Sequence, residues 1–130
     1  MNLTPLEIRD TLVNYWYTNY SYTPTVYQNS TQPDDVNTQN PFVLFSIRFE
    51  DSETLYKGGT ISRYHGFIST HVRSPLMSGN RKAYEIADEV VSVLNLKRIG
   101  TIVTNSSIVG LSGEIDGYFT LPINTPFKIM

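Results

Sequence analysis

The sequence contains no cysteine among its 130 residues. This absence excludes disulfide bonds, zinc held by thiolates, iron–sulfur clusters and catalysis by a thiol. No apolar run approaches the roughly 18 residues that cross a bilayer. The N-terminus, which begins Met-Asn-Leu-Thr-Pro, has neither the basic nor the apolar segment of a secretory signal. We therefore expect a protein that is made and used in the cytoplasm, without a membrane partner.

Charged residues are also scarce, at 17% of the chain, and the net charge is −2. A non-specific nucleic-acid binder needs a concentrated positive surface, which in this chain has to come from local clustering of basic side chains. The length fits one domain spanning residues 1–130. Apolar residues make up 40% of the chain, and nine of its residues are tyrosine, which is a composition that folds.

Two segments have the periodicity of amphipathic helices. The first covers about residues 5–19, where Thr4 is the expected cap, Pro5 the first helical residue and Glu7 the partner that completes a capping box. The second covers about residues 80–96 and has a wide apolar face. The apolar stripe of the first helix consists of Ile8, Leu12, Trp16 and Tyr20.

Alternating patterns predict two main strands, at residues 42–50 and 60–73. Shorter strands are expected at 25–28, 54–57, 101–104, 117–122 and 126–130, and residues 105–116 are expected to form a loop. One face of the 60–73 strand carries Arg63, His65, Phe67, Ser69, His71 and Arg73.

The order of main elements, α-β-β-β-α-β-β, predicts an α+β fold. We expect a mostly antiparallel sheet, because the strands are joined by short turns, with both amphipathic helices packed on one face. The opposite face then carries arginine, histidine, serine and threonine. Residues 28–41 contain a single apolar residue, Val36, and are predicted to be a long polar loop. Loops of this length inside a compact domain are uncommon and are often functional.

The sequence offers little support for catalysis. His65 and His71 lie six residues apart on one strand, which separates them by about 20 Å, too far to share a metal ion. There is no nucleophile elbow and no phosphate-binding loop. We therefore expect no catalytic residue, no metal and no cofactor, and a protein that is not an enzyme.

Residues 63–70 partly match the strand motif of single-stranded RNA-binding modules, with a basic residue at Arg63 and an aromatic residue at Phe67. His65 and Phe67 would then stack on bases. The match is incomplete, since that fold begins with a strand and this chain begins with a helix.

Several short motifs resemble another family over nearly the whole chain. They are Arg-Phe-Glu at 48–50, Gly-Gly at 58–59, Gly-Phe-Ile-Ser at 66–69, a Ser-Pro break at 74–75, Gly79 before a helix with Ala-Asp-Glu at 87–89, Gly-Tyr-Phe-Thr-Leu-Pro-Ile at 117–123 and Pro-Phe at 126–127. This layout is similar to the tail terminator proteins of long-tailed bacteriophages, the lambda gpU-like family.

The resemblance implies assembly and no catalytic chemistry. Tail terminators form a hexameric ring on the head-proximal end of the tail tube, stop tube polymerisation and provide the surface for head joining. The implied partners are other copies of the chain, the tail tube protein and the head–neck connector protein, and DNA only passes through the channel. The implied location is the neck-proximal end of the virion tail, after assembly in the host cytoplasm. A neck or head-completion adaptor is the alternative assembly role.

A ring subunit needs two complementary patches, because a head-to-tail interface closes only when unlike surfaces meet. The candidate interface residues lie in the polar loop and on one strand face. Removal of residues 30–39 is expected to leave a folded monomer that forms no ring. The candidates are Asp34, Asp35, Arg63, His65, Phe67, His71 and Arg73.

Overall fold

In the computed structural model, the described residues are 3–28, 40–50, 53–54, 62–76, 79–115 and 117–129. Most of the predicted polar loop at 28–41, including Asp34 and Asp35, lies outside these ranges.

The two predicted helices are confirmed. Helix α1 spans Pro5–Asn19, and the side chains of Thr4 and Glu7 form the expected capping box. Helix α2 spans Arg81–Leu94. It ends two residues earlier than expected, because Asn95 is extended and Leu96 has a φ of 53°, a backbone conformation that cannot continue a right-handed helix.

Eight strands form one sheet in the order β1-β2-β5-β10-β7-β6, and β8 and β9 also pair with β10. The pair β1–β2 is parallel and the other pairs are antiparallel. The predicted α+β class with a mostly antiparallel sheet is therefore confirmed. The strands are β1 (Thr25–Tyr27), β2 (Phe42–Phe49), β5 (His65–Pro75), β6 (Arg98–Ile99), β7 (Ile102–Thr104), β8 (Ile108–Val109), β9 (Gly113–Ile115) and β10 (Tyr118–Ile129).

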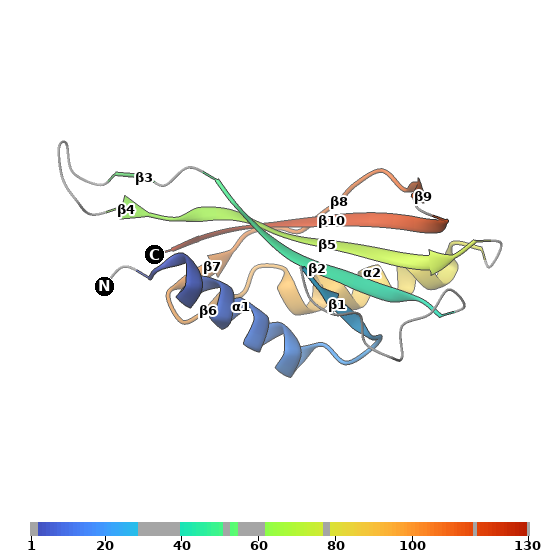
Figure 1. Cartoon of the computed structure of the whole chain (residues 1–130), viewed down its shortest axis with the longest axis horizontal. Helices are drawn as coiled ribbons and strands as arrows, with labels where there is room; N and C mark the ends of the chain where they lie inside the picture. Colours follow the sequence, from blue (N-terminus) through green and yellow to red (C-terminus); the bar gives the residue numbers. More distant parts are fainter. Residues whose placement is uncertain are drawn as a thin grey trace.

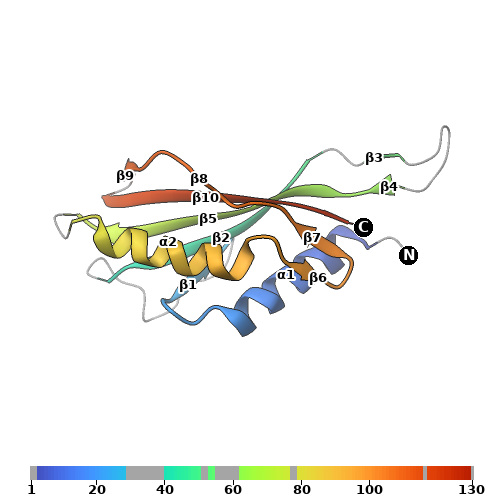
Figure 2. The same cartoon turned by 180° about the vertical axis from the view of Figure 1, so that it is seen from behind.

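Both helices cover the same face of the sheet, as expected (Figures 1 and 2). The core lies between them and the sheet. On the α1 side, the Trp16 ring stacks on Tyr20 with a centroid distance of 4.2 Å and lies 5.1 Å from Phe45. On the α2 side, a row of small and branched residues packs on β5 and β10. That row consists of Ala83, Ile86, Ala87, Val90 and Leu94.

The expectation of a single strand over 60–73 was wrong. Strand β5 begins at His65, and Ser62–Arg63 form a separate short strand, β4, that pairs with β3 (Glu53–Thr54). The β3–β4 pair extends beyond the end of the main sheet (Figure 1). The division falls where the pairing with β2 stops: the Glu50 N–H donates to the His65 carbonyl at 2.9 Å, and upstream of Tyr64 the chain pairs with β3.

The expectation of separate strands at 117–122 and 126–130 was also wrong, because β10 runs unbroken through Pro122 and Pro126. Their carbonyl groups accept bonds from Gly110 N–H and Asn105 N–H, each at 2.8 Å, on the side away from β5. In an antiparallel strand, the N–H and C=O of one residue point to the same side. The N–H groups that proline lacks therefore fall outside the β5–β10 ladder, which loses no bond.

Residues 105–116 were expected to form a loop, but they contain β8 and β9. Both strands are very short and follow the edge of β10 opposite β5. The sequence could not reveal them, because two or three residues show no alternation without knowledge of their partner.

Candidate functional site

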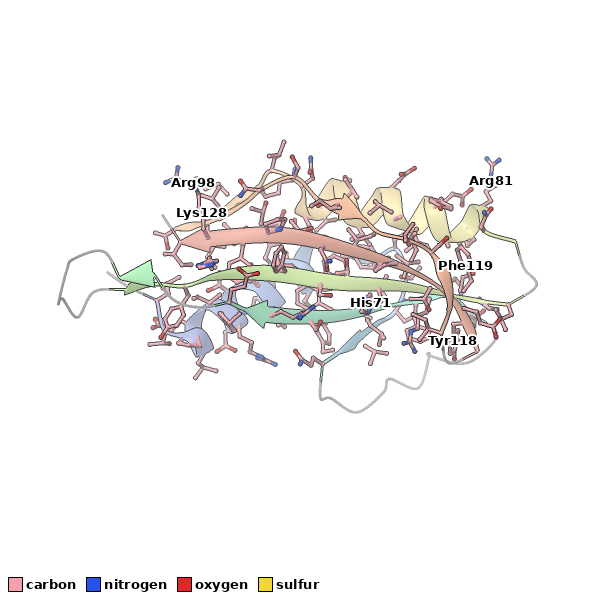
Figure 3. All side chains as sticks on the ribbon, turned by 90° about the horizontal axis from the view of Figure 1, so that it is seen from above. His71, Arg81, Arg98, Tyr118, Phe119 and Lys128 are labelled. Atoms are coloured by element: carbon pink, nitrogen blue, oxygen red, sulfur yellow. The ribbon has the colours of Figure 1, made fainter. Side chains whose placement is uncertain are left out.

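The sheet surface opposite the helices, formed by β2, β5 and β10 and called here the open face, is the first candidate site. Figure 3 looks down on it. The strand register places side chains of all three strands in rows across this face. The rows are Arg48–Phe67–Pro126, Leu44–His71–Pro122 and Phe42–Arg73–Thr120.

Four of the seven candidate residues lie together on this face. His65, Phe67, His71 and Arg73 alternate along β5, as the sequence pattern predicted. Arg63 does not join them, because it lies in β4, opposite Glu53. Asp34 and Asp35 are outside the described residues.

Arg73 lies beside two aromatic rings at one end of the open face. Phe42 and Tyr118 meet edge to face, with ring centroids 5.3 Å apart. The Arg73 guanidinium carbon lies 5.8 Å from the centroid of Tyr118, within cation–π range. Neither ring was a candidate from the sequence, because their proximity to Arg73 depends on the register of three strands.

His71 lies in the middle of the open face, beside a shallow hollow of about 320 Å³ that Val26, Leu44 and Ser46 also line. Burial lowers the pKa of His71 below its usual value, and the positive charges of Arg73 and then Arg48 lower it further. The neutral imidazole is therefore favoured over the imidazolium at neutral pH.

At the other end of the open face, His65 Nε2 lies 3.3 Å from Glu50 Oε2. Lys128 is opposite His65 in register on β10. Among the residues that the structure describes, the paired part of this face carries three basic side chains, those of Arg48, Arg73 and Lys128, and one carboxylate, that of Glu50.

The edge of the sheet next to β10 carries a second feature, called here the apolar arm, which comprises residues 108–115. Leu111 is 95% exposed. Large apolar side chains gathered on a surface commonly mark an interaction site. The exposed ones here are Ile108, Val109, Leu111 and Ile115.

The opposite edge of the sheet contains a groove of about 280 Å³, called here the edge groove. It lies between α1 and the part of β2 that extends past β1. Its lining combines apolar side chains with the polar side chains of Arg9, Gln28 and Ser46. The lining residues are Arg9, Val13, Tyr27, Gln28, Phe45, Ser46, Ile47 and Phe49.

Within the described part of the chain, no group of three or more histidine, aspartate or glutamate side chains is arranged to hold a metal ion. None of the described helices is long and apolar enough to cross a membrane.

Comparison with known proteins gives a likeness of fold alone. No family model matches the chain, and no curated protein matches it. One solved structure, whose name states no function, is similar over 94% of this chain and 95% of its own, with a TM-score of 0.69 and 15% sequence identity.

Proposed function

We propose that the chain is a virion assembly protein, a tail terminator that forms a ring on the head-proximal end of a phage tail tube. The ring stops tube polymerisation and provides the surface for head joining. The observation that carries this proposal is the presence of two unlike edges on one sheet. One edge carries the apolar arm and the other the edge groove.

Unlike edges favour a head-to-tail interface. Such contacts use a different patch on each partner and build a closed ring when the rotation between subunits closes. The sequence resemblance to tail terminators supplies the specific role, and the α+β fold with two helices on one sheet face is compatible with it. The proposed partners are further copies of the chain, the tail tube protein and the head–neck connector protein.

The test is a capping experiment on tail tubes of the same phage. Purified protein is added to polymerised tubes, and tube ends are imaged by electron microscopy. We expect a ring on one end of each tube and no further growth when tube protein is added. Tubes that stay uncapped while the protein binds purified connector would contradict the terminator role and favour the neck adaptor.

A second candidate, a single-stranded RNA-binding module, is favoured by one arrangement. His65 and Phe67 lie on the same face of β5, beside Arg48 and Lys128 in the neighbouring strands. Aromatic side chains with nearby cations are the usual platform for single-stranded nucleic acids. Binding of single-stranded oligonucleotides that weakens steeply with salt and is lost in Phe67→Ala would support this candidate.

A further inference from the structure

We propose that the apolar arm of one copy adds as a strand to β2 in the edge groove of the next copy. This inference rests on the proposed function, since it assigns the contact between neighbouring ring subunits.

The β2 edge has room for another strand. Strand β1 pairs only with Val43–Phe45, whereas β2 continues to Phe49. Val43 N–H donates to the Pro24 carbonyl and the Phe45 carbonyl accepts from Gln28 N–H, so odd-numbered residues direct their backbone groups to this side. Ile47 and Phe49 therefore point theirs to the same side, where the described residues place no strand.

The groove beside this edge offers space for the side chains of an added strand. Its volume of about 280 Å³ is close to the ~300 Å³ at which the usual range of ligand pockets begins. Val13 from α1 and Phe45, Ile47 and Phe49 from β2 give it an apolar wall. Strand addition of this kind takes affinity from main-chain bonds and specificity from alternate side chains that enter pockets.

The arm has the complementary properties. The even-numbered residues of β10 direct their backbone groups to this edge, as the bond from Gly110 N–H to the Pro122 carbonyl shows. Gly113 and Ile115 pair with two of these residues, Thr120 and Tyr118. By alternation, Glu114 directs its backbone groups away from β10. Ile115, which follows Glu114, and Leu111, three residues before it, are both exposed.

Charge selects the groove of a second copy as the place for the arm. Glu114 lies in the middle of β9, and Arg9 lines the groove. Pairing of two arms around a twofold axis would bring Glu114 against Glu114, and pairing of two grooves would bring Arg9 against Arg9, both unfavourable. In the single chain, Arg9 contacts Asp10 at 2.7 Å in an exposed ion pair. Exposed ion pairs contribute little to stability, so Arg9 can exchange Asp10 for Glu114 of a neighbouring copy at little cost in free energy.

Cross-linking tests the contact directly, because the chain has no cysteine of its own. Gln28→Cys and Leu111→Cys introduce single thiols at the groove and on the arm. The two variants are mixed and treated with a short bismaleimide, at high protein concentration and again on tail tubes. We expect cross-linked dimers in the mixture and none from either variant alone. Arg81→Cys, which places a thiol on the exposed start of α2, is the matched control partner for Leu111→Cys.

Charge reversal provides the second readout. Arg9→Glu and Glu114→Arg should each weaken self-association by about tenfold, and the double variant should recover most of the loss. Arg81→Glu, a reversal of the same size on α2, should leave self-association unchanged. Circular dichroism spectra establish that each variant is folded.

The outcomes separate this inference from the proposed function. Rings that form without the Gln28–Leu111 cross-link, and that tolerate both charge reversals, would overturn the inference and leave the terminator proposal standing. A protein that neither self-associates nor caps tail tubes would overturn both. Cross-links from Leu111→Cys alone would show an arm-to-arm contact and contradict the head-to-tail geometry.

Discussion

At the residue scale, one buried hydroxyl forms hydrogen bonds with backbone groups at the C-terminal end of α2. Thr104 is 1% exposed. Its Oγ1 donates to the Leu94 carbonyl and accepts from the Lys97 N–H, each at 2.6 Å. These bonds satisfy a carbonyl at the helix end and tie the helix to β7, where Thr104 lies.

We predict that Thr104→Val lowers the free energy of unfolding by about 1–3 kcal/mol, since the buried Leu94 carbonyl and the part-buried Lys97 N–H lose their partner while the side-chain shape is kept. Urea denaturation monitored by circular dichroism measures the change. Thr101→Val, at an exposed position nearby, is the control and should have little effect. Equal stability of the two variants would refute the role of this hydroxyl.

His71 makes stability depend on pH. Its pKa in the folded protein is lowered by burial, then by Arg73 and Arg48, so below the unfolded value of about 6.5 the unfolded chain binds more protons. The contribution of His71 to the free energy of unfolding is therefore fully present above about pH 6.5. It is lost as the pH falls towards the lower pKa that His71 has in the folded protein.

We predict that the melting temperature of the wild-type protein falls between pH 7.5 and pH 5.5, and that His71→Gln reduces this fall. Differential scanning calorimetry at both pH values provides the measurement. His65→Gln, which removes the other histidine of the same strand face, is the control. In this variant the melting temperature should still show the decrease that His71 causes. A His71→Gln protein with an unchanged fall would contradict the assignment.

At the element scale, Gly66 sets how closely β2 and β5 approach. A Cβ atom at this position would lie 2.0 Å from the Arg48 carbonyl oxygen, which belongs to the backbone of the paired strand. Real Cβ atoms do not approach other atoms so closely, and the strand cannot yield without breaking its ladder.

We therefore predict that Gly66→Ala lowers the free energy of unfolding by about 1–3 kcal/mol, the usual cost of overpacking, or more. Gly113→Ala is the matched control, since nothing lies within 4 Å of its added Cβ. Chemical denaturation of both variants gives the comparison. A Gly66→Ala protein as stable as the Gly113→Ala protein would mean that the two strands separate easily.

The elements predicted correctly are those with a local signal. Helix α1 follows from its capping box and four-residue spacing, and the faces of β2 and β5 follow from strict alternation. The errors occur where a distant partner decides the structure. The continuity of β10 through Pro122 and Pro126 depends on which side their carbonyls face, and β8 and β9 exist through pairing with β10.

At the scale of the whole molecule, the same distinction applies to the candidate sites. The alternation of residues along a strand predicted from the sequence that one face carries His65, Phe67, His71 and Arg73. Their neighbours Phe42, Arg48 and Tyr118 required the register of three strands. The apolar arm and the edge groove arise at the two edges of the completed sheet, which no local pattern reveals.

We propose that the chain is a subunit of a closed head-to-tail ring. Sedimentation velocity over a wide concentration range, with electron micrographs of any large species, measures its state of assembly. We expect one discrete species of about six subunits that appears in images as a closed ring, either for the protein alone or on tail-tube ends. Open-ended polymers, a twofold dimer, or a monomer that leaves tail tubes uncapped would contradict it.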